Sequence, residues 1–339
     1  MSVTIQTIAR LAKVSTATIS RYLNYPESVS PKKRALIAEV IKEQNYVPNE
    51  LARGLTRNIF STIGVIMPDI NNTFFSAVLL GIELELEKSG YSTLVCNTHG
   101  HIEREKRYLE MLASRRVAGI IFVGTRPLAA EDNAHIVELA RKVPVMLIND
   151  RLASEDVSFV MTNEEQGMGL AVEYLYGLGH RNIGLLNGNP PFTTYRYKLD
   201  GFTGAMKRLG LEIRDGFVQS IDPYEKGGYS GMQKIGQLAS RPTAVVTAND
   251  QIAIGAVRAV FESGWTVPRD MSIVGFSNTP ISAEVYPRLT TVDQFPYDTG
   301  KVAAQQLVEQ IDTRNTRHSG LRIDCKMMVR ASCAQAAPG

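Results

Sequence analysis

TIQTIARLAKVSTATISRYLN, residues Thr4 to Asn24, decides how the amino-terminal part of the chain folds. Apolar residues recur in this stretch at helical spacing, in two short blocks. Residues 13–15 lie between the blocks and leave room for a turn of the length expected in a helix-turn-helix. The apolar positions are Ile5, Ile8, Ala9 and Ala12 in the first block, and Ile19, Tyr22 and Leu23 in the second.

The second predicted helix has a polar outward face. Ser15 or Thr16 can cap this helix by accepting a hydrogen bond from a free amide of its first turn. Small side chains at a helix start, with an arginine one turn later, can enter a major groove and reach base edges and phosphates. The alternative is a pair of amphipathic surface helices within a larger domain. The residues on the outward face are Thr16, Ala17, Ser20 and Arg21.

Length and composition bound the rest of the molecule. A chain of 339 residues exceeds what one hydrophobic core usually supports, so two or three domains are expected. No segment has the ~20 consecutive apolar residues of a membrane span, and the amino terminus lacks the apolar stretch of a signal peptide. We therefore expect a cytoplasmic protein. Cys96 lies in a predicted strand, YSTLVC, where a packed thiol is favoured over a metal site or a disulfide.

Charge is distributed unevenly along the chain. Residues 1–58 contain nine Lys and Arg against four Glu, a net charge of +5, whereas the remainder carries −2. A basic head on a faintly acidic body suits phosphate contacts made by the head alone. A solvated charged surface would give a similar excess, so this pattern is only supportive.

A third helix and a short hinge follow. Ser30 and Pro31 are favourable residues for a helix start, and residues 32–44 carry an apolar stripe that should cover the first two helices. Pro48 ends this unit. Residues 49–55 are too few to form a stable helix alone, and Gly54 lowers helix stability by about 1 kcal/mol more. We interpret them as a hinge that is helical only when braced, with a plain linker as the alternative.

From Ser61 onward, apolar strands alternate with helical segments, in two successive series. Strands joined by crossover helices form parallel sheets with helices on both faces. The number of strands favours two similar α/β lobes over one sheet. The predicted fold is therefore an all-α helix-turn-helix headpiece followed by an α/β core of two doubly wound parallel-sheet lobes. A ligand would bind beyond the carboxyl ends of the strands, in the crevice between the lobes.

The motifs VSTATISRYLN, YVPNELARGL, IGVIMPDINNTFF, GHRNIGLLNG, TANDQIAIGA and VGFSNTP…YPRLTTVDQ together resemble the LacI/GalR family of transcriptional regulators. The resemblance implies a headpiece at 1–47, a hinge helix at 48–60, and a core at 61–330 of the periplasmic-binding-protein type I. The first lobe would span about 61–161 and 291–321, and the second about 162–290 and 322–330. Residues 331–339 would form a tail.

The resemblance also implies a set of DNA contacts. Thr16, Ala17 and Arg21 match the positions that read bases from the recognition helix. Leu55 matches a hinge leucine that wedges into the minor groove, a role open to apolar side chains because they can unstack a base step. Ordinary packing is the alternative for Leu55. The full predicted set is Thr16, Ala17, Thr18, Ser20, Arg21, Asn24, Arg53 and Leu55.

The resemblance implies an effector site between the lobes. Phe74 and Phe75 match a pair at the mouth of the cleft, and Asn249 and Gln294 match lining positions. Asp250 either joins this site or caps the next helix.

The chain departs from the pattern of sugar-binding members at this site. Lys198, with Arg196 nearby, replaces a usual arginine, Ser277 replaces a usual aspartate, and Asn163-Glu164 replaces a usual Asp-Asn pair. Two cations in a cleft that lacks the aspartate would tolerate an anion. We therefore predict a carbohydrate-type effector, with the hypothesis that it is an acidic or phosphorylated sugar rather than a plain hexose.

Two rival functions are an α/β enzyme and a solute-binding protein without a DNA role. No P-loop, G-x-S-x-G elbow, HExxH or convincing G-x-G-x-x-G motif is present, and the histidines are not spaced as metal ligands. We expect no enzyme activity, no cofactor and no metal. A solute-binding protein would need an export signal and no basic head.

The predicted mechanism is a linkage between two partners, double-stranded DNA and a small molecule. A homodimer would place two recognition helices in successive major grooves of a near-palindromic operator. An effector that closes the cleft would change operator affinity, and the coupling must be reciprocal. After Arg330 the chain ends in ASCAQAAPG without leucine heptads, so we expect a dimer rather than a tetramer.

Overall fold

The computed structural model describes residues 3–44, 46, 61–129, 131–189, 192–313 and 319–337. The chain divides into two compact units, Met1–Ser61 and Thr62–Gly339. The predicted hinge at 48–60, including Arg53 and Leu55, lies outside the described residues, as does the side chain of Asn24. The roles assigned to these residues therefore stay predictions.

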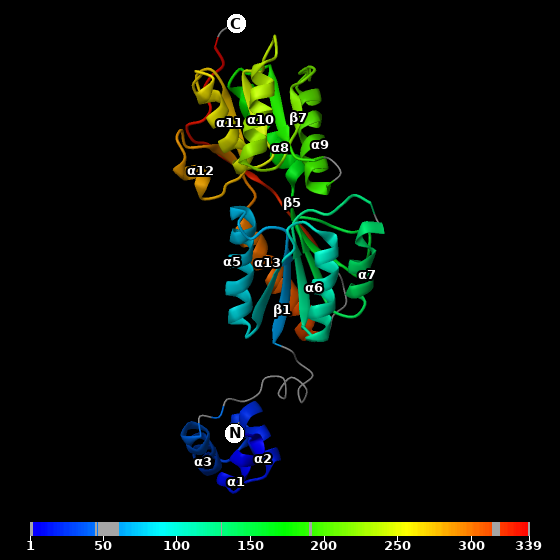
Figure 1. The fold of residues 1–339 in the computed structure, drawn as a ribbon, viewed down its shortest axis with the longest axis vertical. Coiled ribbons are helices and arrows are strands. Elements are labelled where there is room, and N and C mark those ends of the chain that lie inside the picture. The colour runs from blue at the N-terminus through cyan, green and yellow to red at the C-terminus, as the bar shows by residue number, and fades with distance from the viewer. Residues whose placement is uncertain are drawn as a thin grey trace. The chain divides into compact units, whose positions relative to one another are not determined.

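In the headpiece, α1 (Ile5–Leu11), α2 (Thr16–Asn24) and α3 (Pro31–Glu43) follow one another, with a short 3-10 helix, η1 (Pro26–Ser28), before α3 (Figure 1). The turn between α1 and α2 places Lys13 at a φ of 51°. The apolar stripes of the three helices meet in one small core, which gives this unit a hydrophobic centre of its own. That core is formed by Ile8, Ala9, Ala12, Ile19, Val29, Ile37 and Val40.

The first lobe of the core contains a parallel sheet with strand order β11-β5-β4-β3-β1-β2. Strands and helices alternate along most of this lobe as predicted, although β4 is followed directly by β5. Helices α5 and α13 pack on one face of the sheet, and α6 and α7 on the other. The strands are β1 (Thr62–Met67), β2 (Ser92–Asn97), β3 (Gly119–Val123), β4 (Val145–Ile148), β5 (Ser158–Thr162) and β11 (Gly320–Ile323). The helices are α5 (Thr73–Lys88), α6 (Ile102–Ser114), η2 (Glu131–Asn133), α7 (Ala134–Ala140) and α13 (Pro296–Thr313).

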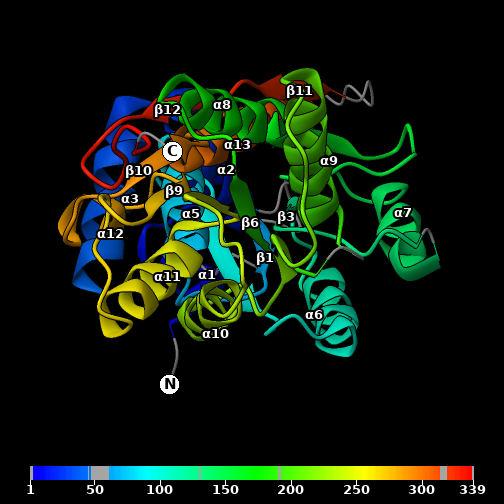
Figure 2. The same cartoon turned by 90° about the horizontal axis from the view of Figure 1, so that it is seen from above.

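The second lobe repeats this plan with strand order β12-β10-β9-β8-β6-β7, in which only β12 is antiparallel to its neighbour. Figure 2 shows α8 and α9 on one side of this sheet and α10 and α11 on the other. The strands are β6 (Ile183–Asn187), β7 (Val218–Ser220), β8 (Ala244–Thr247), β9 (Ser272–Ser277), β10 (Thr290–Asp293) and β12 (Lys326–Met328). The helices are α8 (Glu164–Gly177), α9 (Thr193–Arg208), α10 (Glu225–Gly236), α11 (Asp250–Glu262) and α12 (Ile281–Glu284).

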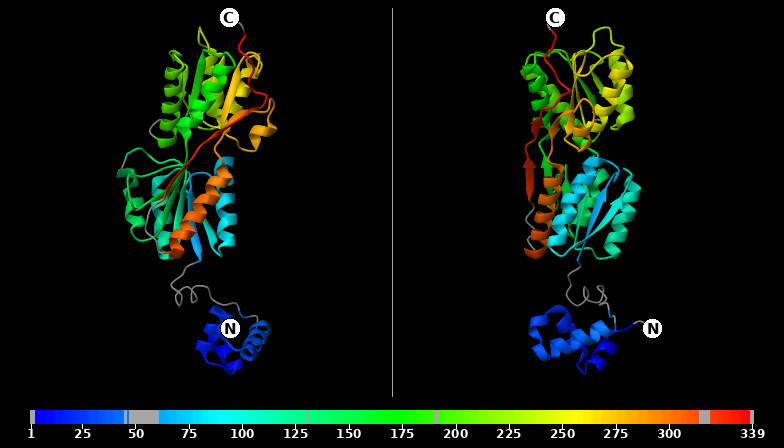
Figure 3. Two further views of the ribbon diagram at one scale, coloured as in Figure 1. Left: turned by 180° about the vertical axis from the view of Figure 1, so that it is seen from behind. Right: turned by 90° about the vertical axis from the view of Figure 1, so that its left-hand side faces the viewer.

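Three crossovers join the lobes: β5 to α8, β10 to α13, and β11 to β12. Figure 3 shows the last of these as the strand pair that runs from one lobe into the other near the carboxyl end. The structure moves several predicted boundaries. Residues 162, 322 and 323 were assigned to the second lobe, but they belong to β5 and β11, which pair with each other in the first sheet. Residues 291–293 were assigned to the first lobe, but β10 pairs with β9 and β12 in the second sheet, so this crossover follows Asp293.

The predicted tail at 331–339 packs against the second lobe in its described part. Ile273 donates its backbone N–H to the carbonyl of Ser332, and Ala336 donates to Leu178. His180 is buried beside this segment. Its Nε2 lies 3.1 Å from the Ala334 carbonyl oxygen, and burial lowers its pKa. The tail therefore belongs structurally to the lobe.

Helices α10 and α11 approach so closely that glycine is required at their crossing. A Cβ on Gly255 would lie 1.9 Å from the carbonyl oxygen of Glu225, which belongs to the backbone of α10 and cannot rotate away. We expect Gly255→Ala to lower the free energy of unfolding by about 3 kcal/mol in urea denaturation, because the helices must separate. Gly177→Ala is the matched control, since no heavy atom lies within 4 Å of its added Cβ. Equal unfolding midpoints for the two variants would refute the crossing as a close contact.

No helix in the described ranges is long and apolar enough to cross a membrane. Cys96 is buried and unpaired in β2, as its position in a strand predicts.

Candidate functional site

The headpiece presents one face of α2 to solvent. The Oγ of Ser15 accepts a hydrogen bond from the backbone N–H of Thr18 at 3.1 Å, so Ser15 rather than Thr16 caps the helix. Ile19 is fully buried in the headpiece core. Thr16, Ala17 and Arg21 are exposed, and Ala17 and Arg21 lie on the side of the helix opposite Ile19. A small, polar helix start with an exposed arginine one turn later is thus present, in the geometry that groove binding requires.

In the core, two adjoining cavities lie between the carboxyl ends of the strands of the two lobes. We call the smaller one, of about 80 Å³, the inner pocket, and the larger one, of about 270 Å³, the outer chamber. The inner pocket is lined by Asn72, Phe74, Phe75, Gly124, Thr125, Asn149, Glu164, Thr194, Tyr195, Lys198, Asn249, Ser277 and Gln294. Five of these residues also line the outer chamber, namely Asn72, Phe75, Thr125, Tyr195 and Asn249.

A buried ion pair dominates the electrostatics of the inner pocket. The ammonium of Lys198 lies 3.2 Å from Oε1 of Glu164 and donates to the carbonyl of Ala248 at 2.9 Å. The same Glu164 oxygen accepts hydrogen bonds from Thr194 and Gln294. The two side chains are only 6% and 3% exposed, so water does not solvate their charges. Each charge is neutralised by the other instead.

Two buried oxygens in the inner pocket have no hydrogen-bond partner among the described residues. They are Oε2 of Glu164 and Oδ1 of Asn149. Buried acceptors without partners are costly, so such atoms usually meet a water or a ligand. Both can accept a hydrogen bond from a hydroxyl group. The pocket is therefore suited to a neutral molecule that carries several hydroxyls.

Six of the eight residues predicted for the effector site line the inner pocket: Phe74, Phe75, Lys198, Asn249, Ser277 and Gln294. Arg196 does not. Its side chain is exposed and pairs with Asp200 at 3.0 Å, one turn along α9. Positions two apart on a helix point about 200° apart. Because Lys198 faces the pocket, Arg196 must face solvent.

Asp250 is the second prediction that the structure corrects. It neither lines the cavities nor caps α11, because the cap is Asn249, whose Oδ1 accepts from Ile252. The carboxylate of Asp250 accepts from the backbone and hydroxyl of Thr279, at 2.7 and 2.8 Å, and from Thr291. Burial raises its pKa to about 6. Asp250 therefore ties the segments after β9 and within β10 together beneath the pocket.

The sequence argument missed a carboxylate at the junction of the lobes. Asp150 follows β4 and is fully buried. Its Oδ2 accepts from the backbone N–H of Arg126 at 2.6 Å and from the hydroxyl of Thr193 in the other lobe. Beside it, Thr125 accepts from the backbone N–H of Thr194 at 3.2 Å. An Asn-Asp pair at a strand end was the available signal. Asp150 thus fixes a direct contact between the lobes.

Burial raises the pKa of Asp150 to about 6, against the hydrogen bonds that lower it. The folded protein then holds this proton more tightly than the unfolded chain, so its stability rises as the pH falls from 7 towards 4. Between pH 7 and pH 5, we expect wild type to gain about 1 kcal/mol of unfolding free energy relative to Asp150→Asn, which cannot titrate. Urea denaturation of both proteins at the two pH values measures this difference. A constant difference would contradict the raised pKa.

The chain is similar to known proteins over nearly its whole length. The family described as "Bacterial regulatory proteins, lacI family" matches residues 4–49, and the "Periplasmic binding protein-like domain" matches 172–333. The ribose operon repressor of Escherichia coli (strain K12) is 32% identical, across 97% of this chain and 99% of that protein.

Comparison with solved structures shows the same similarity. The Lac repressor dimer bound to operator and the anti-inducer ONPF has a TM-score of 0.88 and 27% identity, covering 98% of this chain and 100% of that one. A LacI family regulator from Enterococcus faecium with bound ribose has a TM-score of 0.73 and 28% identity, covering 81% of this chain and 100% of that one. These matches join the headpiece and the two-lobed core in one known architecture. The chain belongs to the lacI family of bacterial regulatory proteins.

Proposed function

We propose that this chain is a transcriptional repressor that binds a near-palindromic operator as a homodimer, and that a neutral carbohydrate bound between the lobes, at the inner pocket and its boundary with the outer chamber, controls its operator affinity. The observation that carries the DNA role is the exposed face of α2 on a separate, basic headpiece. Similarity to the Lac repressor dimer bound to operator supports the dimer and the DNA partner. The side chains proposed to contact DNA are Thr16, Ala17, Thr18, Ser20, Arg21, Asn24, Arg53 and Leu55.

The proposed effector is a neutral polyol, and this revises the acidic or phosphorylated sugar suggested by the sequence. That suggestion required two unpaired cations in the cleft. Arg196 lies outside the cavities, and Lys198 is neutralised by Glu164. Glu164 and Ser277 both line the inner pocket, so Glu164 supplies a carboxylate that Ser277 cannot. An anion would meet an unpaired carboxylate oxygen, whereas a hydroxyl would donate to it.

The proposed coupling uses residues from both lobes. Asn72 and Asn149 approach the inner pocket from the first lobe, and Asn249 and Lys198 from the second. A ligand that bonds to both sets favours one angle between the lobes over others. DNA favours the lobe arrangement that suits paired headpieces, so the two ligands must change each other's affinity by the same factor.

The proposal gives the chain no catalytic role, and because DNA is the partner it places the chain in the cytoplasm. The relatives are named as repressors. In the described part of the chain, no group of His, Cys, Asp and Glu could hold a metal ion.

Selection from random double-stranded DNA, followed by gel shifts with the enriched sequence, tests the proposal. We expect a near-palindrome to be enriched and its affinity to change on addition of neutral pentoses or hexoses, but not of aldonates or sugar phosphates. Calorimetry on the protein without DNA gives the sugar affinity directly. Failure to enrich any sequence would refute the repressor, and a response to sugar phosphates alone would refute the neutral effector.

A further inference from the structure

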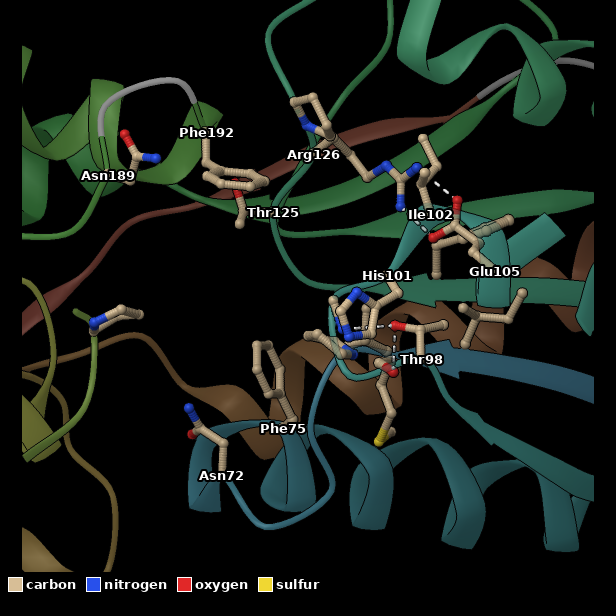
Figure 4. Close-up of a pocket in the computed structure, with 18 of the residues that line it drawn as sticks. Asn72, Phe75, Thr98, His101, Ile102, Glu105, Thr125, Arg126, Asn189 and Phe192 are labelled. Atoms are coloured by element: carbon tan, nitrogen blue, oxygen red, sulfur yellow. Dashed lines mark hydrogen bonds and ion pairs between the residues drawn. The ribbon is translucent and has the colours of Figure 1, made fainter.

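The outer chamber is larger than the inner pocket and differs from it in chemistry. It lies between α6, the ends of β1 and β3, and the loops of the second lobe around Phe192 and Tyr224. Figure 4 shows the rings of Phe75 and Phe192 projecting into it from opposite lobes. Most of its wall is apolar and is formed by Ile66, Met67, Pro68, Phe75, Ile102, Phe122, Val123, Pro127, Phe192 and Pro223.

The charges in the chamber wall are paired within the wall itself. Arg126 donates to both carboxylate oxygens of Glu105, at 2.6 and 2.7 Å, and its Nε donates to Asn133 at 3.0 Å. His135 lies 2.7 Å from Oε1 of Glu105. The neighbouring cation and the carboxyl's hydrogen bonds outweigh its burial and lower the pKa of Glu105. A bound group therefore meets a neutral, largely apolar surface rather than a free charge.

Volume separates what each cavity can hold. An apolar void of about 150 Å³ is enough to bind benzene. The inner pocket, at about 80 Å³, is smaller than that void and by itself holds only part of a sugar, whereas the outer chamber, at about 270 Å³, has room for the rest of the sugar and a planar ring. Rings placed between Phe75 and Phe192 could stack on or meet the edges of these side chains. The side chains of His101 and Asn189 line the chamber and could form hydrogen bonds with a polar edge of such a ring.

The two cavities are continuous, because Asn72, Phe75, Thr125, Tyr195 and Asn249 line both. One molecule can therefore extend from one into the other. We infer that the effector is a glycoside, with its sugar in the inner pocket and at the boundary that the two cavities share, and with a planar aromatic substituent further into the outer chamber. This inference rests on the proposed function, since it extends the same effector site.

Contacts between the lobes border the chamber. Tyr224 lines it and donates its hydroxyl to Asp69 of the first lobe at 3.1 Å. Pro127 and Phe192 pair as an isolated bridge between the lobes. An aromatic substituent would fill the space between these contacts and hold the two lobes in the arrangement of this structure. A free sugar occupies only the inner pocket and the shared boundary, so the two-part ligand should bind more tightly.

Calorimetry with matched glycosides tests the inference on the full-length protein. The probes are the methyl and p-nitrophenyl glycosides of D-ribose, D-glucose and D-galactose, and the disaccharide cellobiose. For the sugar that binds, we expect the p-nitrophenyl glycoside to have a Kd lower by on the order of tenfold or more, because it buries a planar apolar ring. Equal affinities, or tighter binding of cellobiose, would overturn an aromatic-binding chamber. If no sugar or glycoside binds, the proposed effector site itself fails.

A variant pair separates the chamber from the inner pocket. Ile102→Trp should fill the chamber and remove the advantage of the p-nitrophenyl group, while the methyl glycoside keeps its Kd. Leu128→Trp is the control, since Leu128 is 51% exposed and lies outside both linings. Thermal unfolding checks that both variants fold. Preserved p-nitrophenyl preference in a folded Ile102→Trp protein would refute the placement of the ring in the chamber, whatever the glycoside series shows.

Discussion

Replacing Arg21 by glutamate should abolish specific operator binding and leave the headpiece folded. Arg21 lies on the exposed face of α2, and its side chain makes no ion pair with the described residues. Its loss therefore costs the fold little. A good arginine contact to a base is worth about 1–3 kcal/mol, and a homodimer loses it twice. The reversed charge adds repulsion from phosphate, so we expect operator affinity to fall by at least about a thousandfold.

Fluorescence anisotropy with a labelled operator, at two salt concentrations, measures this loss. Lys33→Glu is the matched control, because it makes the same charge change on the exposed surface of α3. That variant should weaken binding modestly and equally for operator and random DNA. Circular dichroism should show unchanged helicity in both variants. If Lys33→Glu weakened operator binding as much as Arg21→Glu, total charge rather than the face of α2 would govern recognition.

Glu164→Gln should remove effector binding and also destabilise the core. The amide cannot neutralise Lys198, whose ammonium lies 3.2 Å away in a buried site. Breaking one side of a buried pair costs about 3–5 kcal/mol. The carboxylate oxygen of Glu164 that has no hydrogen-bond partner among the described residues is also replaced. We expect effector affinity to fall by about a hundredfold or more, measured by calorimetry, with a clear fall in the unfolding midpoint.

Two further variants separate binding from stability. Glu173→Gln is on the same helix and breaks a pair with Arg208 whose side chains are 48% and 61% exposed, so it should cost under about 1 kcal/mol. The double variant Glu164→Gln with Lys198→Met removes both buried charges. It should recover much of the stability and none of the effector affinity. Recovery of both properties would show that Glu164 acts only through Lys198.

Local patterns predicted the elements of this fold, and distant pairings limited the prediction of the site. The apolar blocks around Ile8 and Ile19 predicted α1 and α2, because the spacing of apolar residues in a helix is visible among close neighbours in the sequence. Phe75 and Gln294 reached the candidate site through motif resemblance. The ion pair between Glu164 and Lys198 joins two helices, and no local pattern encodes it.

The corrections have the same origin. Arg196 and Lys198 were treated as one cationic pair because they are close in sequence, although two residues along a helix reverse the direction of a side chain. Thr291 looked like the start of a return to the first lobe, but its strand is held in the second sheet by pairing with β9 and β12. Asp150 was missed since its partner Thr193 is far away in the sequence.

The three crossovers between the lobes have a mechanical consequence. They lie along one edge of the core, because β5 neighbours β11 in the first sheet and β10 neighbours β12 in the second. Because the connections lie along this one edge, the lobes can rotate relative to each other about a single hinge axis. Glu164 and Gln294 lie next to the connecting segments, close to the hinge axis, where movement is smallest. Tyr224 and Asp69 are in contact several strands away from this axis. A ligand group held near the edge without connections acts further from the hinge axis, and therefore has the greater influence on the angle between the two lobes.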